Sequence, residues 1–461
     1  MSDFQLIVIG AGPGGYTSAL TAARLGLKTA IIEQKECGGT CLNRGCIPTK
    51  ALLHASGTYK ETLQAGRMGL VFDNGRIDLA ALNGYRQQTV DQLRGGVESL
   101  LKSAGISILR GKAQIKAGKH VYVEGPDEGT FSADNIIIAT GSEPARPPIP
   151  GLELKSVVTS NELLEDLDNL PASIVIIGGG VIGVEFATFF TELGTDVTIV
   201  EGLDRLLPNM DRELGQSLAL TLKKQNVKIF TGAMVEKVKR NEDRLQVCFT
   251  QKGNAMAAEA DLVLCAIGRR PFTDGLFEEG LEVRMEGRRI SVDENFKTSI
   301  DGIYAIGDVS SKIQLAHVAA AQGTACARII AGKDTGMNLD IVPSCVYCRP
   351  EIASVGLTEA EAKQSGLQVT SAKCTLFSNA RTIISDAGRS FMKVLADSQT
   401  GKIVGAQFIC QNASDMISQI SEAIANSMTP DDLLKAMRPH PTYEEALSDV
   451  LSELQRKLEQ K

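Results

Sequence analysis

The chain has 461 residues, a length typical of three or four compact domains rather than one. Its hydrophobic content of 43% suffices for buried cores, and 45 glycines without a tryptophan favour nucleotide-binding α/β sheets over a β-sandwich. The net charge of −7 argues against a nucleic-acid partner, because binding a polyanion requires clustered cationic side chains.

The N-terminal sequence MSDFQLIVIGAG enters an apolar strand without the basic start or cleavage site of a signal peptide. Residues 172–190 are apolar enough to resemble a membrane span, but three consecutive glycines and Glu185 interrupt them. A strand, a tight turn and a helix explain this stretch better. We therefore expect a soluble cytoplasmic protein without membrane association, in which most of the ten cysteines are small buried residues.

Two glycine fingerprints form an internal repeat. Each follows an apolar, β-branched run and opens a helical stretch that ends near a glycine, Gly26 or Gly194. A second strand then ends in an acid, Glu33 or Glu201. Each copy thus has five marked positions, namely three fingerprint glycines, the glycine after the helix and the acid, and all five are separated from their counterparts by the same number of residues. The fingerprint glycines are Gly10, Gly12 and Gly15 in the first copy and Gly178, Gly180 and Gly183 in the second.

This pattern predicts two βαβ dinucleotide sites. Glycines let the backbone approach a pyrophosphate at a helix N-terminus, and the acid accepts hydrogen bonds from a ribose diol. A 2′-phosphate would be repelled by Glu201, and the only arginine in the following stretch EGLDRLLP is Arg205. The second site is therefore predicted to prefer NAD over NADP.

Two further strands end near a glycine. DNIIIATG reaches Gly141 and DLVLCAIG reaches Gly268, and each resembles the last strand of its domain. The proline-rich SEPARPPIPG after the first indicates a linker. Asp308, in the later TSIDGIYAIGD, has two interpretations: a hydrogen-bond partner for a flavin ribityl chain, or part of a hairpin turn.

The order of motifs resembles the flavoprotein disulfide reductases, and among them the dihydrolipoyl dehydrogenase branch most closely. The matching pieces are GAGPGG, GGTCLNRGCIPTK, IIIATGS, GGGVIGVE, AIGD, LAHVAAAQG, PEIASVGLTE and HPTYEE, which span nearly the whole chain. The resemblance implies an α/β fold with two Rossmann-like dinucleotide-binding domains, a central domain and a C-terminal α+β dimerisation domain. The implied boundaries are 1–145 for FAD, 146–270 for NAD, 271–340 for the central domain and 341–461 for dimerisation.

The cofactors implied by the resemblance are FAD at the first fingerprint and NAD at the second, with no metal. Asp308 would then bind the ribityl chain, and the helix starting near Ala316 would present backbone N–H groups to the flavin. The cofactor-binding residues implied are Gly10, Gly12, Gly15, Glu33, Thr40, Lys50, Ala113, Gly141, Gly178, Gly180, Val181, Gly183, Glu185, Glu201, Val235, Gly268, Asp308 and Ala316.

Cys41 and Cys46 are candidates for a metal clip, a permanent cross-link or a redox pair. A zinc site would need further clustered ligands, and a permanent cross-link would close a very small loop in a reducing compartment. The resemblance implies the redox pair. In a regular helix residues five apart are separated by about 7.5 Å along the axis, beyond the usual reach of a disulfide. The segment must therefore depart from a regular helix, and Asn43 and Gly45 tolerate such a departure.

Lys50 follows Cys46 by four residues and would share its face of a continuing helix, within reach of a flavin. Its expected ion partner is Glu185 in the second fingerprint helix. Cys37, Cys345 and Cys348 depart from the pattern of the family, and we interpret them as packing cysteines.

Four histidines are candidates for the base that a thiol reaction requires. His440 precedes a capping-type Thr442 and has Glu445 five residues later, on the first turn of the next helix. Taken alone, this arrangement indicates a helix start with a loop histidine as readily as a catalytic dyad. The resemblance implies a dyad that reaches the disulfide of the other subunit, and therefore a homodimer.

The other three histidines receive lesser roles. His120 lies in a polar hairpin and is expected to be exposed, and His54 is expected to be a packing or surface residue. The resemblance places His317 near the flavin, where it is not expected to transfer a proton.

The activity implied by the resemblance is oxidation of protein-bound dihydrolipoyl groups through the cysteine pair and FAD, with hydride transfer to NAD. The implied partners are a 2-oxoacid or acetoin dehydrogenase acyltransferase, or a glycine cleavage H protein. Two alternatives remain at this point: an NAD(P)H-dependent reductase of another small disulfide, and a redox-inactive nucleotide-binding regulatory protein.

Overall fold

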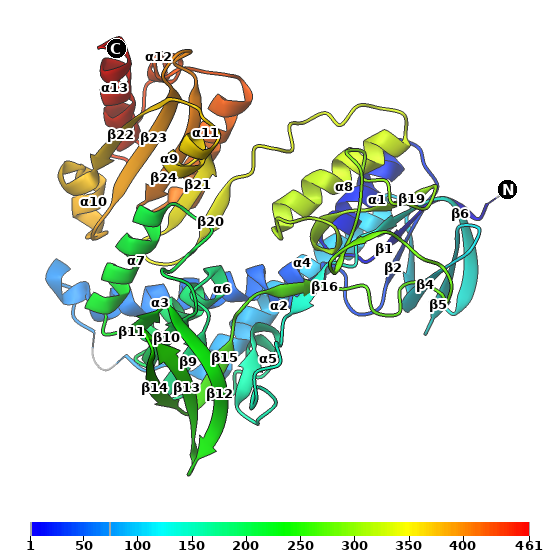
Figure 1. The fold of residues 1–461 in the computed structure, drawn as a ribbon, viewed down its shortest axis with the longest axis horizontal. Helices are drawn as coiled ribbons and strands as arrows, with labels where there is room; N and C mark the ends of the chain where they lie inside the picture. Colours follow the sequence, from blue (N-terminus) through cyan, green and yellow to red (C-terminus); the bar gives the residue numbers. More distant parts are fainter. Residues whose placement is uncertain (1, 73–74, 461) are drawn as a thin grey trace.

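The computed structural model describes residues 2–72 and 75–460, and its chain forms three units (Figure 1). The first unit contains the blue and cyan N-terminal strands together with α8, which comes from much later in the sequence. The second unit contains the green strands, and the third the orange and red C-terminal elements. An extended segment at residues 331–343 leads from α8 to the third unit.

The first unit is built on a seven-stranded sheet in the order β3-β2-β1-β6-β5-β4, with β19 also paired to β6. Strands β1, β2, β3 and β19 run parallel to the second half of β6, whereas β4, β5 and the first half of β6 form an antiparallel meander. Helices α1 and α8 pack against each other beside this sheet. The elements are β1 (Phe4–Ile9), α1 (Pro13–Arg24), β2 (Thr29–Glu33), α4 (Leu79–Ser103), β3 (Ser107–Arg110), β4 (Lys112–Lys116), β5 (His120–Glu124), β6 (Gly129–Ile138), β19 (Ile303–Ala305) and α8 (Ala316–Ile330).

The second unit repeats this plan with a five-stranded parallel sheet in the order β11-β10-β9-β15-β8. Its antiparallel meander, β12-β13-β14, forms a separate sheet that projects at the bottom of Figure 1. The elements are β8 (Val157–Thr159), β9 (Ser173–Ile177), α6 (Val181–Glu192), β10 (Asp196–Glu201), β11 (Lys228–Thr231), β12 (Ala233–Asn241), β13 (Arg244–Gln251), β14 (Asn254–Ala260) and β15 (Leu262–Cys265).

The duplication predicted from the two fingerprints is confirmed by these matching strand orders, and in space each sheet continues past the strand that leads to its glycine. The strands that precede Gly141 and Gly268 are not the last of their sheets, because β19 lies beyond β6 and β8 lies beyond β15. Strand β8 comes from shortly before β9, whereas β19 comes from a distant part of the chain and leads directly to Asp308.

The third unit is a five-stranded antiparallel sheet in the order β20-β21-β24-β23-β22, with α11 and α13 packed on it. Its core is formed by the apolar faces of these two helices and of the central strands. The elements are β20 (Ser344–Val346), β21 (Ile352–Gly356), α9 (Glu359–Gln364), β22 (Val369–Thr375), α10 (Ala380–Ser385), β23 (Phe391–Asp397), β24 (Ile403–Ile409), α11 (Ala413–Ala425), α12 (Pro430–Leu434) and α13 (Glu445–Glu459).

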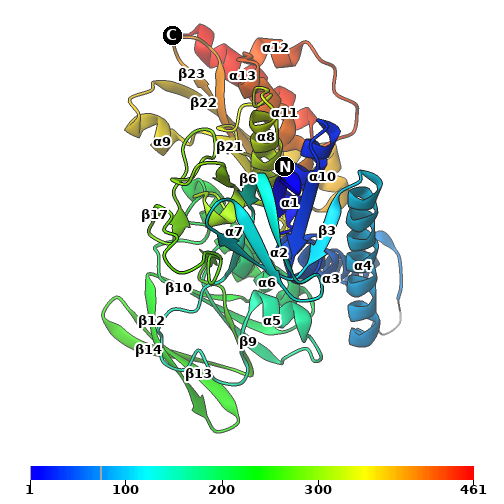
Figure 2. The same ribbon diagram turned by 90° about the vertical axis from the view of Figure 1, so that its right-hand side faces the viewer.

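The apolar stretch at residues 172–190, which resembles a membrane span in sequence, contains the buried helix α6. That stretch is β9, a glycine turn and α6, as the sequence predicted. Almost every residue from Gly183 to Glu192 is buried, because α6 lies between its own sheet and α3 (Cys46–Leu63) of the first unit (Figure 2). Of the described helices, none is both long and apolar enough to span a bilayer.

Shorter elements complete the fold. They are α2 (Gly39–Arg44), η1 (Ala65–Met68), β7 (Ser142–Pro144), α5 (Ser160–Glu165), α7 (Arg212–Lys224), β16 (Arg269–Pro271), β17 (Met285–Glu286), β18 (Arg289–Ile290), η2 (Gly307–Val309) and η3 (Leu376–Ser378).

The third glycine of each fingerprint closes its helix onto the preceding turn. A Cβ atom on Gly15 would lie 1.7 Å from the carbonyl oxygen of Gly10, and one on Gly183 would lie 2.0 Å from that of Gly178. By contrast, a Cβ atom on Gly180 would meet nothing within 4 Å, and its φ of −75° suits any residue.

Substitution of Gly183 and of Gly180 should therefore have different effects on stability, because the first glycine is needed for backbone packing and the second only leaves room for a ligand. Gly183→Ala should lower the free energy of unfolding by about 1–3 kcal/mol, because the methyl group would have to displace backbone. Gly180→Ala should leave stability within about 0.5 kcal/mol of the wild type. Chemical denaturation of both variants measures the difference, and equal destabilisation would contradict this division of roles.

Candidate functional site

One cavity of about 1470 Å³ connects the two fingerprint loops with the cysteine pair and the edge of the third unit. Four residues predicted for the site do not line it: Gly15 and Gly183, which pack beneath the loops, and His440 and Glu445. The predicted residues that line it are Gly10, Gly12, Glu33, Thr40, Cys41, Cys46, Lys50, Ala113, Gly141, Gly178, Gly180, Val181, Glu185, Glu201, Val235, Gly268, Asp308 and Ala316.

The two strand-end acids have the same backbone environment. Glu33 accepts hydrogen bonds from the N–H groups of Ala11, at 2.7 Å, and Lys35, at 2.9 Å. Glu201 accepts one from the N–H of Gly179 and one from that of Leu203, at 2.7 Å. Each carboxylate is thus held against its own fingerprint loop at the cavity wall, where its remaining lone pairs can accept from a ribose.

The loops themselves leave room for a phosphate. Gly12 and Gly180 are the N-caps of α1 and α6, and neither has a side-chain cap for the free N–H groups that follow. A Cβ atom on Gly12 would meet nothing closer than 3.8 Å. Two uncapped helix N-termini with open backbone and an acid nearby fit the diphosphate and ribose of two dinucleotides.

The cysteine pair lies at a break between two helices, as predicted. Helix α2 ends at Arg44 and α3 begins at Cys46, with Gly45 between them. A Cβ atom on Gly45 would lie 2.9 Å from the carbonyl oxygen of Thr40, so the close approach of the two helices requires glycine there. The Asn43 side chain steadies α2 by donating to the carbonyl oxygens of Cys37 and Gly39, each at 3.0 Å.

The two thiols ionise differently in the reduced protein. A hydrogen bond from the Cys41 thiol, helped by the charge of Lys50, lowers the pKa of Cys46 to about 7 despite burial and the charge of Glu185. The same hydrogen bond and burial raise the pKa of Cys41. Cys46 is therefore the thiol that carries negative charge near neutral pH.

The predicted ion pair between Lys50 and Glu185 is confirmed. The Lys50 Nζ lies 2.9 and 2.8 Å from the two carboxylate oxygens, and the Glu185 side chain is only 4% exposed. The Tyr347 N–H donates to Glu185 Oε1 at 3.0 Å, and its ring lies under Lys50, 4.6 Å from Nζ to the centroid. The pair thus joins α3, α6 and the third unit at the cavity.

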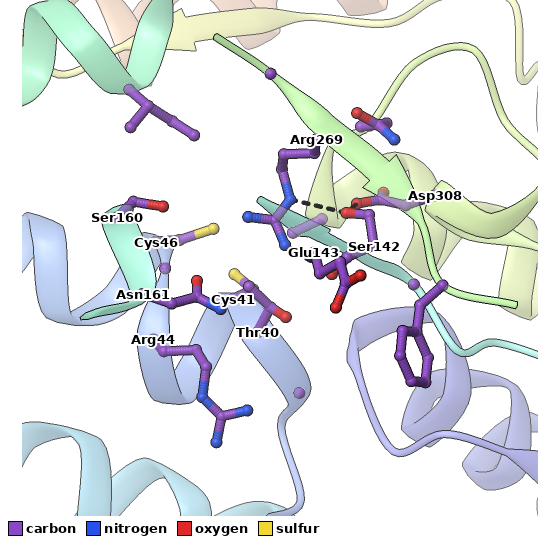
Figure 3. Close-up of a pocket in the computed structure, with 18 of the residues that line it drawn as sticks. Thr40, Cys41, Arg44, Cys46, Ser142, Glu143, Ser160, Asn161, Arg269 and Asp308 are labelled. Carbon is purple, nitrogen blue, oxygen red and sulfur yellow. Dashed lines mark hydrogen bonds between the residues drawn. The ribbon is translucent and has the colours of Figure 1, made fainter. Parts of the chain in front are cut away.

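Sequence reasoning missed a buried group around Asp308. In Figure 3 the guanidinium of Arg269 lies between the cysteine pair and Asp308. Ser142 Oγ donates to Asp308 Oδ2 at 2.5 Å, and Arg269 donates to the Ser142 hydroxyl and carbonyl oxygens at 2.8 and 2.7 Å. Burial raises the pKa of Asp308, while Ser142 and Arg269 oppose this shift. The one signal in the sequence for Ser142 and Arg269 was their equivalent position in the two copies. Each directly follows the glycine that ends IIIATG or LCAIG.

His440 and Glu445 meet on the surface of the third unit. The His440 Nδ1 lies 2.8 Å from Glu445 Oε1, and the histidine side chain is 74% exposed. The Thr442 N–H donates to the other carboxylate oxygen at 2.9 Å. This hydrogen bond, with that to His440, lowers the pKa of Glu445. Glu445 begins α13 as predicted, but Thr442 does not cap it with its hydroxyl, which donates instead to the Pro439 carbonyl.

The other histidines are all exposed. His54 lies on α3 and His120 starts β5, as predicted. His317 lines the cavity, and its Nε2 lies 2.8 Å from the carbonyl oxygen of Pro343.

The three unexplained cysteines differ in burial. Cys37 and Cys348 are buried, whereas Cys345 lines the cavity, and burial raises its pKa to about 11. Strand β20 ends at Val346, so Cys345 lies within the strand and Cys348 beyond its end. Across residues 2–72 and 75–460, no group of three or more His, Cys, Asp or Glu side chains could hold a metal ion.

A duplicated dinucleotide fold with a dithiol between its two cradles defines a nucleotide-dependent dithiol–disulfide oxidoreductase. The chain belongs to the pyridine nucleotide-disulphide oxidoreductase family, whose model matches residues 4–323, and its residues 342–451 match the dimerisation domain of that family. The cofactors are FAD and NAD, and the dimerisation domain supports a homodimer.

Similar proteins agree with this membership. The chain is 38% identical to dihydrolipoyl dehydrogenase of Geobacillus stearothermophilus, over 96% of this chain and 94% of that protein. It is 36% identical to dihydrolipoyl dehydrogenase of Chlamydia pneumoniae, over 97% of this chain and 96% of that one.

Solved structures with the same fold include LpdA of Mycobacterium tuberculosis, with a TM-score of 0.90 and 27% identity over 98% of this chain and 99% of that one. The flavoprotein disulfide reductase RclA of Escherichia coli, solved as a Cu(II) complex, gives a TM-score of 0.87 and 29% identity. That match covers 98% of this chain and 100% of that one.

The hydrogen bond between the thiols can be tested by comparing Cys41→Ser with Cys41→Ala. Serine keeps an O–H donor for the Cys46 thiolate and alanine does not, so the pKa of Cys46 should be higher in Cys41→Ala by about one pH unit. The rate of iodoacetamide alkylation of Cys46 against pH, followed on its peptide by mass spectrometry, measures both values. Identical profiles would show that a hydrogen bond from residue 41 does not stabilise the thiolate.

Proposed function

We propose that this chain is an NAD-dependent dihydrolipoyl dehydrogenase, which oxidises protein-bound dihydrolipoyl groups to the lipoyl disulfide. The observation that carries the proposal is the Cys41–Cys46 pair at a helix break inside one cavity that both dinucleotide cradles line. The relatives named dihydrolipoyl dehydrogenase at 36–38% identity support the choice of substrate.

The proposed cofactor sites follow the two cradles. Gly10, Gly12 and Glu33 would hold the ADP part of FAD, and Asp308, braced by Ser142, would hold its ribityl chain. When bound there, FAD would supply a two-electron carrier between the cysteine dithiol and NAD. The buried Lys50–Glu185 pair would fix the position of α3, and with it Cys46, against the nucleotide-binding units.

The remaining predicted residues keep their roles in this proposal. Gly178, Gly180, Val181, Glu201, Val235 and Gly268 would line the NAD site, and Thr40, Ala113, Gly141 and Ala316 the FAD site. We propose domains 1–145, 146–270, 271–340 and 341–461, because residues 271–340 contribute β19 and α8 to the first unit.

The two cysteines have different roles in the proposed thiol–disulfide exchange. In the oxidised enzyme a dihydrolipoyl thiolate attacks Cys41 of the Cys41–Cys46 disulfide, which forms a mixed disulfide and releases Cys46 as a thiolate. The second dihydrolipoyl sulfur then attacks the substrate sulfur of that mixed disulfide, closing the lipoyl ring and releasing Cys41. Two substrate thiols are oxidised and one enzyme disulfide is reduced. The low pKa of Cys46 suits its part as the leaving group.

The base for this exchange is proposed to come from the other subunit. His440 is exposed and lies outside the cavity of its own chain, in the unit that matches the dimerisation domain. The partner subunit's His440 would take the proton of the attacking dihydrolipoyl thiol, and Glu445 would orient the ring and stabilise its charged form.

The physiological partner would be a separate lipoyl-bearing protein. Its candidates are the acyltransferase of a 2-oxoacid or acetoin dehydrogenase complex and the H protein of glycine cleavage. We propose a cytoplasmic enzyme, since a redox pair that cycles through the dithiol suits a reducing compartment.

Nucleotide choice should follow Glu201. With dihydrolipoamide, kcat/KM for NAD should exceed that for NADP by about 10²-fold or more, because the carboxylate repels a 2′-phosphate. The nearby Arg205 could not compensate, since it lies outside the cavity wall and donates to the Pro208 carbonyl at 2.9 Å.

Steady-state kinetics with both nucleotides measure this ratio, and Glu201→Gln should reduce it while preserving the shape of the site. A preference for NADP would overturn the nucleotide assignment. Turnover of another small disulfide, without turnover of dihydrolipoamide, would overturn the substrate.

The shared site can be tested with mixed dimers. His440→Gln should slow dihydrolipoamide oxidation by about 10²–10⁴-fold, the usual contribution of a positioned base, and leave flavin binding intact. Cys41→Ser should be inactive because it cannot form the disulfide. In a dimer of one chain of each variant, one site would carry both changes and the other neither.

Activity should therefore reappear when the two inactive proteins exchange subunits, approaching half of the wild-type value per mixed dimer. Differently tagged chains verify the exchange. A mixture that exchanges and stays inactive would place the base within its own chain.

A further inference from the structure

A second buried cluster lies on the same helix pair as Lys50 and Glu185, away from the cavity. At its centre is Glu192 at the end of α6, whose side chain has no exposed surface. The Ser56 hydroxyl of α3 donates to its Oε2 at 2.6 Å, and the Lys60 Nζ lies 3.9 Å from its Oε1. The Arg349 Nε lies 2.8 Å from the same oxygen, an ion pair that is not aligned as a hydrogen bond.

Arg349 ties this cluster to the third unit. It follows β20, and its Nη2 donates to the Leu53 carbonyl oxygen of α3 at 2.9 Å. Its guanidinium occupies the space left by a missing side chain, since a Cβ atom on Gly57 would lie 1.3 Å from Nη2. Burial raises the pKa of Glu192, and Arg349 and Ser56 oppose the shift.

The two clusters repeat each other along the helices. Glu185 and Glu192 are seven residues apart on α6, which places them about 10.5 Å apart along its axis and on one face. Lys50 and Gly57 have the same spacing on α3. The chain segment from Tyr347 to Arg349 contacts the first carboxylate at one end and the second at the other. The apolar packing of the two helices is non-directional, and two polar attachments one above the other define their register more sharply than one attachment does.

We propose that Glu192, clamped by Arg349, Ser56 and Lys60, is a positioning residue that fixes the register of α3 against α6 and so sets how closely Glu185 approaches Lys50 and Cys46. The inference rests on the proposed function for its meaning, because Cys46 and Lys50 are the groups it positions. The residues of the cluster do not line the cavity.

The proposal predicts the sign of a change at Cys46. Cys46 and Lys50 share α3, so their separation is unchanged when that helix slips. Glu185 belongs to α6, and its charge raises the pKa of Cys46 only while the register holds.

Two groups outside α3 favour the thiolate, and both are held on the first unit. Residue 41 lies on α2, which is joined to α3 through Gly45 and contacts it, and Arg269, whose charge interacts with Cys46, is hydrogen-bonded to Ser142 of β7. Loss of the clamp therefore weakens the Glu185 contribution and lowers the pKa of Cys46.

Two variants separate this effect from direct electrostatics. Arg349→Met removes a positive charge, which by itself would raise the pKa of Cys46, whereas loss of register lowers it. Gly57→Ala displaces the guanidinium without changing any charge. Its matched control is Gly95→Ala in α4, another helical glycine, where an added Cβ atom meets nothing within 4 Å.

The experiment measures alkylation of Cys46 against pH in the reduced holoenzyme, in a Cys41→Ser background, with mass spectrometry of its peptide. We expect the pKa of Cys46 to fall by about half a pH unit or more in both Arg349→Met and Gly57→Ala, and to stay unchanged in Gly95→Ala. Thermal unfolding of each variant is recorded in parallel.

A raised pKa in Arg349→Met would overturn the proposal, because it would show only the missing charge. Lower melting temperatures with an unchanged pKa in both variants would also overturn it, because the cluster would then be merely structural. The assay uses no substrate, so a failure to oxidise dihydrolipoamide would contradict the proposed function and leave this result as it stands.

Discussion

The packing of α3 against α6 is the constraint on which the site depends. The first unit supplies α3, with Cys46 and Lys50 near its start, and the second unit supplies α6 directly after its fingerprint loop. One hydrophobic core contains residues of both helices and of the third unit, such as Leu52, Phe186 and Ile352. Because each cradle folds on its own sheet, contacts between the units, with this shared core the main apolar one, bring the dithiol and the two nucleotide loops into one cavity.

The groups around Cys46 act on its pKa in opposite directions. A buried Glu185 without a partner would be costly, and Lys50 removes that cost, but the Glu185 charge also opposes ionisation of Cys46. The hydrogen bond from Cys41 favours ionisation, so the thiolate depends on its own redox partner. Reducing the disulfide thereby creates both the thiolate and the donor that stabilises it. The asymmetry between two chemically identical side chains comes from their positions, since Cys41 lies within α2 and Cys46 starts α3.

The sequence predicted those features that depend on short stretches of chain. The fingerprint loops, the acids Glu33 and Glu201 and the break at Gly45 follow from local backbone requirements, and the structure has all of them. The Lys50–Glu185 pair was found only through the family resemblance. The Arg269–Ser142 and Arg349–Glu192 contacts were missed, because they join residues more than a hundred positions apart and no spacing in the sequence marks them. The addition of β19 to the first sheet was missed for the same reason.

The His440–Glu445 pair on the surface illustrates how a site with a dithiol and a base can be divided between two chains. His440 already has its carboxylate partner within its own chain, and the loop that carries it is held from several sides. Asn379 donates to the Thr442 carbonyl oxygen at 2.9 Å, and the hydroxyl of the buried Tyr443 is hydrogen-bonded to Ser385 Oγ, at 2.7 Å, and to Gln411 Oε1, at 3.1 Å. A loop ordered before association loses little conformational entropy when two subunits meet. In the proposed dimer, the folding of each chain would therefore complete two rigid halves, a base and a dithiol cavity, and association would only have to align them.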